Sequence, residues 1–86
     1  MFILSRDKKT LINCSNIASV SIKSGINYHD KKWWKIRAMY PAVSSDILYD
    51  TLCRYDTENL CIDNFNKLCC RIASGRENEI IDMNDL

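Results

Sequence analysis

The stretch DTENLCIDNFNKLCCRIASG, residues 56–75, decides the fold class, because its apolar residues have the spacing of an amphipathic helix. They recur every three or four positions and so share one helix face: Cys61, Phe65, Leu68, Cys69 and Ile72. Asp56 or Thr57 can cap the first turn, and Gly75 follows the last turn as a stop. We therefore predict a helix over about residues 57–74.

The residues before this helix have the two-residue period of β-strands. Residues 17–23, IASVSIK, alternate apolar and polar side chains, which is typical of a strand with one face in the core. Residues 33–40 are predicted to form the next strand, which Pro41 closes because its nitrogen has no hydrogen to donate to a neighbouring strand. Residues 24–32 contain a glycine and are predicted to form the hairpin loop between the two strands.

Shorter segments complete the predicted fold. We predict strands at 2–5 and 10–13, a turn at 42–45, a strand at 47–55 and a short edge strand at about 78–83. The predicted class is α+β, with a small antiparallel β-sheet of about four strands and one C-terminal α-helix packed on one face. All 86 residues are assigned to a single domain, because the sequence contains neither a linker nor a repeat.

Composition and motifs argue against several classes of function. The 47% hydrophobic and 27% charged content is typical of a globular protein, and no apolar run approaches the ~20 residues of a membrane span. The start of the chain is unlike a signal peptide, so we predict a cytoplasmic location. The five cysteines are odd in number and lack CxxC spacing, which fits reduced thiols without a metal site. No catalytic or cofactor motif is present, so we predict that the protein is not an enzyme and needs no cofactor.

Charge is distributed unevenly along the chain, although the net charge is only +1. Residues 1–40 contain eight Lys and Arg against two acids, a balance of +6. Residues 41–86 contain four against nine, a balance of −5. This polarity favours association of the chain with copies of itself or with an anionic ligand.

The candidate binding residues lie in KKWWKIRAMY, residues 31–40. Alternation along a strand places Trp34 on the core side and places Trp33, Lys35 and Arg37 on the opposite face. An aromatic ring can stack on a nucleobase, Arg can hold a phosphate through two hydrogen bonds, and Lys adds a point charge. We therefore predict that Trp33, Lys35 and Arg37 bind an anionic ligand.

Tyr28 and His29, in the preceding loop, are predicted to close over a ligand held at Trp33. Two other interpretations of this face stay open. Trp33 would also suit the interface of a homo-oligomer, where tryptophan is enriched. Alternatively, Lys35 and Arg37 only solubilise an exposed sheet, with their aliphatic stems covering the indole.

Five segments, which together hold 41 of the 86 residues and are spread from residue 1 to residue 83, resemble small uncharacterised antiparallel-sheet-plus-helix proteins of low-GC Gram-positive bacteria and their phages and prophages. They are MFILSRDKKTLIN, NIASVSI, LCRYDTENL, LCCRIASG and IIDM. The resemblance implies a phage or mobile-element protein that works in the host cytoplasm. Phage proteins of this size are often anti-defence proteins, which either sequester a nucleotide signal in oligomers or block a host protein.

Three functional hypotheses follow. The first is a non-catalytic, homo-oligomeric anti-defence protein that sequesters a small anionic, nucleotide-derived signal. The second is a protein-interaction inhibitor that docks on and blocks a host defence protein or nuclease. The third is nucleic-acid binding through the same basic face, which the near-neutral total charge disfavours because such binding requires many phosphate contacts.

Overall fold

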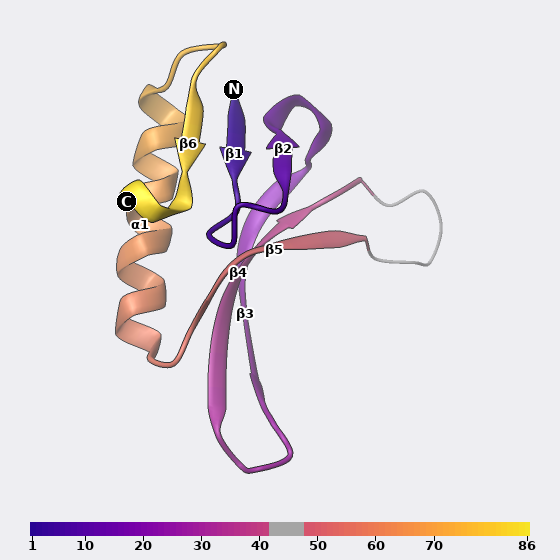
Figure 1. Ribbon diagram of the computed structural model, residues 1–86, viewed down its shortest axis with the longest axis vertical. Helices are drawn as coiled ribbons and strands as arrows, with labels where there is room; N and C mark the ends of the chain where they lie inside the picture. The colour runs from indigo at the N-terminus through magenta and orange to yellow at the C-terminus, as the bar shows by residue number, and fades with distance from the viewer. Residues whose placement is uncertain (42–47) are drawn as a thin grey trace.

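The computed structural model describes residues 1–41 and 48–86 and confirms the α+β class (Figure 1). The predicted turn at 42–45 and the first residue of the predicted strand at 47–55 lie outside the described residues. The elements are β1 (Phe2–Leu4), β2 (Leu11–Asn13), the 3-10 turn η1 (Cys14–Asn16), β3 (Ser19–Ile26), β4 (Lys32–Met39), β5 (Tyr49–Tyr55), α1 (Glu58–Ser74), β6 (Ile80–Asp82) and the 3-10 turn η2 (Met83–Asp85).

The strands form two three-stranded sheets instead of the single sheet that we predicted. The larger sheet is antiparallel, in the order β3-β4-β5. The smaller sheet has the order β2-β1-β6, with β1 antiparallel to β2 and parallel to β6. The short strand β1 pairs with the C-terminal strand β6 and is not part of the larger sheet. A backbone hydrogen bond of 2.9 Å from Arg6 N–H to the carbonyl of Leu52 joins the two sheets.

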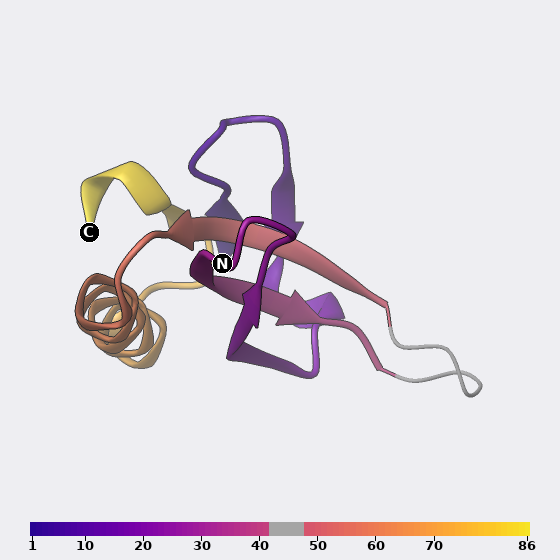
Figure 2. The same cartoon turned by 90° about the horizontal axis from the view of Figure 1, so that it is seen from below.

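The core lies where the inner faces of the two sheets meet α1. Figure 2 looks almost along the helix axis and shows α1 beside β4 and β5. Four of the five residues of the predicted helical stripe are confirmed as core residues, because Cys61 and Leu68 are fully buried while Phe65 and Ile72 pack against the core. The fifth, Cys69, is half-buried and is not part of the core cluster. The sheets contribute the other buried apolar side chains, which include Ile3, Ile12, Ile36, Ala38, Leu52, Cys53, Tyr55 and Ile81.

The ends of α1 follow the sequence signals. Thr57 caps the first turn, because its Oγ1 accepts a hydrogen bond of 3.4 Å from the N–H of Leu60. The helix stops before Gly75, which has an extended backbone (φ −76°, ψ 165°) and not the left-handed one common at helix ends. Within the described residues, no helix is both long and apolar enough to cross a membrane.

The β3–β4 hairpin is longer than predicted. β3 continues through Gly25 to Ile26, so the predicted loop at 24–32 shortens to five residues at its tip. Gly25 pairs with Trp33 across the strands, and the indole lies so close to it that a Cβ would collide with the ring. Gly25 therefore lets the strand pass next to a large aromatic side chain.

A β-bulge interrupts β5. Ile36 pairs with Cys53 whereas its neighbour Arg37 pairs with Thr51, which leaves Leu52 as an extra residue. Leu52 and Cys53 are consecutive, yet they are only 1% and 4% exposed, an arrangement that a regular strand on a half-buried sheet does not allow. The bulge thus adds a core side chain and resets which residues of β5 face outward.

Candidate functional site

The candidate site is the outer face of the β3-β4-β5 sheet, which is the side turned away from α1. Strand pairing assigns its side chains to cross-strand rows: Gly25–Trp33, Lys23–Lys35–Arg54, Ser21–Arg37–Thr51 and Ser19–Met39–Tyr49. We call six of these residues the cationic face: Lys23, Trp33, Lys35, Arg37, Tyr49 and Arg54. The division predicted for the two tryptophans matches this arrangement, because Trp34 packs against the core and its Nε1–H donates to Glu58 on α1 at 3.2 Å.

Two aromatic rings hold three cations on this face. The Nζ of Lys35 lies 5.1 Å from the ring centroid of Trp33 and 4.7 Å from that of Tyr49. The guanidinium carbon of Arg54 lies 5.2 Å from the Trp33 centroid, and that of Arg37 lies 4.7 Å from the Tyr49 centroid. These are cation–π distances, so the rings position the charged groups in the free protein.

The side chains of Lys35 and Tyr49 also form a hydrogen bond. The Nζ of Lys35 donates to the hydroxyl of Tyr49 at 3.3 Å. This bond and the charge of Lys35 hold the pKa of the Tyr49 hydroxyl below its usual value. The pKa of Tyr49 therefore depends on where Lys35 lies.

The central row of the cationic face places three like charges side by side. Lys23, Lys35 and Arg54 occupy directly paired positions on three neighbouring strands, an arrangement that destabilises a sheet. Among the described residues, no acid occupies an outward position of this sheet. Neither ion pair of the described chain involves a cation of this face. The sheet therefore maintains a concentration of positive charge that a bound anion would neutralise.

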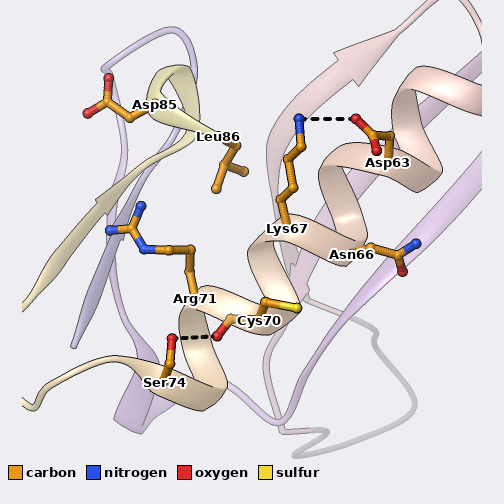
Figure 3. Close-up of a pocket in the computed structure, with 8 residues that line it drawn as sticks. All are labelled: Asp63, Asn66, Lys67, Cys70, Arg71, Ser74, Asp85 and Leu86. Carbon is orange, nitrogen blue, oxygen red and sulfur yellow. Dashed lines mark hydrogen bonds and ion pairs between the residues drawn. The ribbon is translucent and has the colours of Figure 1, made fainter.

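Away from the cationic face, a pocket of about 440 Å³ lies along the exposed side of α1 and beside η2 (Figure 3). Its cations already have acidic partners. Lys67 pairs with Asp63 at 3.1 Å, and Arg71 pairs with Glu79 at 2.6 Å. This pocket consequently lacks the unbalanced charge of the cationic face.

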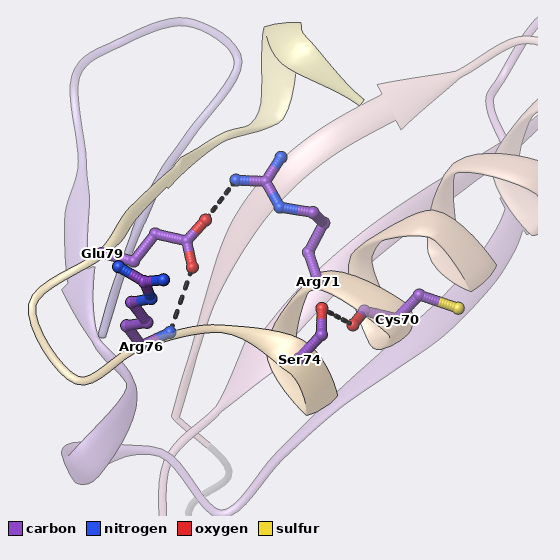
Figure 4. Close-up of polar contacts among 5 residues, drawn as sticks. All are labelled: Cys70, Arg71, Ser74, Arg76 and Glu79. Atoms are coloured by element: carbon purple, nitrogen blue, oxygen red, sulfur yellow. Dashed lines mark hydrogen bonds and ion pairs between the residues drawn. The ribbon is translucent and has the colours of Figure 1, made fainter.

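The Arg71–Glu79 pair connects α1 to the loop that leads into β6 (Figure 4). Glu79 also accepts a hydrogen bond of 3.2 Å from the backbone N–H of Arg76. The hydrogen bond from Arg71, followed by the one from Arg76, holds the pKa of the Glu79 carboxyl below its usual value. These contacts fix the entry of β6, and we assign them a structural role.

Tyr28 and His29 lie at the tip of the β3–β4 hairpin. Tyr28 is 91% exposed, and its ring contacts that of His29 with the centroids 4.1 Å apart. Neither residue is among those that line the pockets beside Trp33. The structure thus brings together Trp33, Lys35 and Arg37 from the predicted set and places Tyr28 and His29 apart from them.

The sequence analysis missed three members of the cationic face: Lys23, Tyr49 and Arg54. Lys23 was visible as a polar position of an alternating strand, and pairing that strand with residues 33–40 would have placed it near Lys35. Tyr49 and Arg54 were harder to assign, because the bulge at Leu52 breaks the alternation of β5 between them.

The cysteines do not form a cluster that suggests a site. All five are free thiols, and Cys53 and Cys61 are buried. Burial raises the pKa of the Cys61 thiol above its usual value, which disfavours the reactive thiolate. Within residues 1–41 and 48–86, no group of three His, Cys, Asp or Glu side chains is arranged to hold a metal ion.

Comparisons with family models, curated proteins and solved structures found no match to this chain. The resemblance to phage proteins therefore stays a prediction.

Proposed function

We propose that this protein is a non-catalytic binding protein that holds a small anionic, phosphate-bearing ligand on its cationic face. The observation that carries the proposal is the row Lys23–Lys35–Arg54, in which three cations are paired across neighbouring strands. Like charges in such positions weaken the sheet, and an anion bound over the row would offset their repulsion.

Each residue type on the face suits phosphate binding. Arg54 and Arg37 carry planar guanidinium groups that can donate two hydrogen bonds to one phosphate, while the lysines add point charges. Tyr49 holds Lys35 and Arg37 in place through cation–π contacts, which reduces the flexibility that binding must remove.

The physiological role that we propose is sequestration of a nucleotide-derived signal, as in a phage anti-defence protein that works in the host cytoplasm. Sequestration requires only occupancy of a site, so a chain without a catalytic motif can perform it. The cationic face supports this role because nucleotide signals carry phosphates.

The test is a calorimetric titration of the full chain with inorganic tripolyphosphate at low salt, using the double variant Lys23→Gln/Lys35→Gln. We expect the wild type to bind with an affinity that falls as salt rises, and the double variant to bind at least about tenfold more weakly. The variant should unfold at a temperature close to that of the wild type, because it removes both the repulsion and the aromatic contacts of Lys35.

The matched control is Lys67→Gln, which removes a lysine from the exposed side of α1. Its affinity for tripolyphosphate should equal that of the wild type. If the wild type fails to bind tripolyphosphate, or if the control loses as much affinity as the double variant, the proposal is wrong.

A specific feature favours self-association as a second activity of the chain. The outer face of the β2-β1-β6 sheet carries four apolar side chains: Phe2, Leu4, Leu11 and Ile80. Leu11 and Ile80 are 53% and 56% exposed, and Asn13 and Asp82 are the polar residues of this face. This apolar patch can pack against the same patch of a second copy about a two-fold axis, and the net charge of +1 causes little repulsion between copies.

The mass of the protein in solution tests this second proposal. We expect a dimer that the double variant Leu11→Lys/Ile80→Lys converts into a folded monomer. Leu60→Lys changes an equally exposed leucine on α1 and should leave the dimer intact. A monomeric wild type would refute self-association and would leave the ligand-binding proposal unaffected.

A further inference from the structure

A pocket of about 480 Å³ opens beside the cationic face, at the point where β5 ends. β4 begins at Lys32, but its pairing with β5 begins only at Trp34, because the chain leaves β5 after Tyr55 to enter α1 (Figure 1). The pocket at this edge of the sheet is lined by both tryptophans, Trp33 and Trp34, by Lys31, Lys32 and Arg54, and by Asn27 and Asp56. Its volume falls in the range of roughly 300–1,000 Å³ that is typical of small-molecule sites.

The pocket is continuous with the cationic face, because Trp33 and Arg54 belong to both. The guanidinium carbon of Arg54 lies 5.2 Å from the Trp33 ring centroid, so the aromatic ring and the first phosphate-binding group are adjacent. Lys31 and Lys32 add two further cations to the wall of the pocket. A ligand can therefore reach from the pocket to the cationic row without leaving positively charged surface.

Two other lining groups do not fit a ligand made of phosphate alone. Asp56 is an acid among the residues that line the pocket, and a carboxylate repels phosphate while accepting hydrogen bonds from N–H groups. The Oδ1 of Asn27 accepts hydrogen bonds from the backbone N–H groups of His29 and Lys31, at 2.9 and 3.1 Å. This arrangement directs the amide NH₂ of Asn27 to other partners, as a donor for a ligand.

We infer that the pocket takes the base of a nucleoside phosphate whose phosphates lie on the row Lys23–Lys35–Arg54. Trp33 stacks on the base, Asp56 accepts a hydrogen bond from a base N–H, and the amide of Asn27 donates to a base acceptor. Arg54 moves from the ring of Trp33 to the phosphates and so uncovers the indole for stacking. The inference rests on the proposed function and names the ligand class of that same site.

The experiment compares tripolyphosphate with the four ribonucleoside triphosphates, titrated into the full chain and followed by calorimetry and tryptophan fluorescence. Base stacking is worth ~1–3 kcal/mol, so at least one nucleoside triphosphate should bind about tenfold more tightly than tripolyphosphate. We expect its binding to change the tryptophan emission, because the cations over Trp33 are replaced by a base.

Asp56→Asn separates recognition of the base from recognition of the phosphates. This variant should bind tripolyphosphate as well as the wild type or better, because a negative charge is removed. Its preference for the nucleoside triphosphate should fall severalfold, since a charged acceptor is replaced by the weaker, neutral amide oxygen. Asp85→Asn removes an acid beside the pocket of Figure 3 and should change neither affinity.

The possible results distinguish the base pocket from the phosphate-binding face. Equal affinities for tripolyphosphate and all four nucleoside triphosphates would overturn the base pocket and leave the phosphate-binding face standing. An unchanged preference in Asp56→Asn would overturn the role given to Asp56. Failure of every ligand to bind would overturn the proposed function itself.

Discussion

At the scale of single residues, the contact between Gly25 and Trp33 defines the cationic face. The indole lies against the backbone of Gly25, and Lys35 and Arg54 lie over the ring. Trp33 therefore links the backbone of β3 to two cations, Lys35 on its own strand and Arg54 on β5. Any side chain at position 25 would have to displace the ring first.

Gly25→Val tests this arrangement. We expect the added atoms to push the indole out of place, to destabilise the fold by about 1–3 kcal/mol through overpacking and to shift the tryptophan emission. Affinity for tripolyphosphate should fall because Arg54 loses its aromatic support. Ser24→Val adds a similar side chain to the opposite face of the same strand, so an equal loss of affinity in that control would contradict the explanation.

At the scale of elements, the Arg71–Glu79 pair connects α1 to the smaller sheet. Glu79 precedes β6, and its backbone carbonyl accepts a hydrogen bond of 2.8 Å from the N–H of Phe2 on β1. One residue thus contacts the helix through its side chain and the central strand through its backbone. The position of β6 relative to the core depends on this connection.

The acid stability of the protein tests the contribution of Glu79. Its pKa is lower in the folded protein than in the unfolded chain, so the stabilisation is present at neutral pH and is lost as the pH falls through the unfolded value near 4.5 and then through the folded one. Glu79→Gln should therefore be less stable than the wild type at pH 7, and the difference should shrink on acidification. Denaturant titrations between pH 7 and pH 3 provide the measurement. A difference that stays constant over this range would contradict the assignment, and Asp85→Asn is the control.

The limits of sequence-based prediction are clearest for β4 and β5. β4 keeps an unbroken two-residue period from Lys32 to Met39, so alternation alone separated Trp33 from Trp34. In β5 the bulge at Leu52 places two consecutive residues in the core, which hides the outward position of Arg54. The pairing of β1 with β6 was equally hidden, because local patterns carry no information about which distant strand becomes the neighbour.

At the scale of the whole molecule, the two oppositely charged halves of the sequence do not simply cancel. Among the described residues, acids of the second half find partners near α1: Asp63 with Lys67, Glu79 with Arg71, and Glu58 with the indole of Trp34. Arg54, although it belongs to the acidic half, joins the cationic face. Within residues 1–41 and 48–86, the fold thus separates a side whose charges form ion pairs from a side whose positive charges form none.

This separation predicts how thermal stability responds to anions. Added tripolyphosphate should raise the unfolding temperature of the wild type, because a ligand that binds only the folded state stabilises it by mass action. The increase should be smaller in Lys23→Gln/Lys35→Gln and unchanged in Lys67→Gln. Thermal unfolding at matched ionic strength, with sodium chloride as the reference salt, provides the measurement. Equal increases in all three proteins would indicate a general salt effect.

The parallel pairing of β1 with β6 also sets the order in which the molecule can fold. Phe2 pairs with Ile80, so closing the smaller sheet joins positions separated by almost the whole sequence, whereas the β3–β4 hairpin closes over a loop of five residues. Short loops close at low entropic cost, so the hairpin that carries Trp33 is expected to form in the folding transition state, with β6 docking afterwards. Conservative substitutions in the hairpin should slow folding, whereas Ile81→Val should mainly accelerate unfolding. The ligand-binding surface would then form before β6 pairs with β1 and completes the smaller sheet.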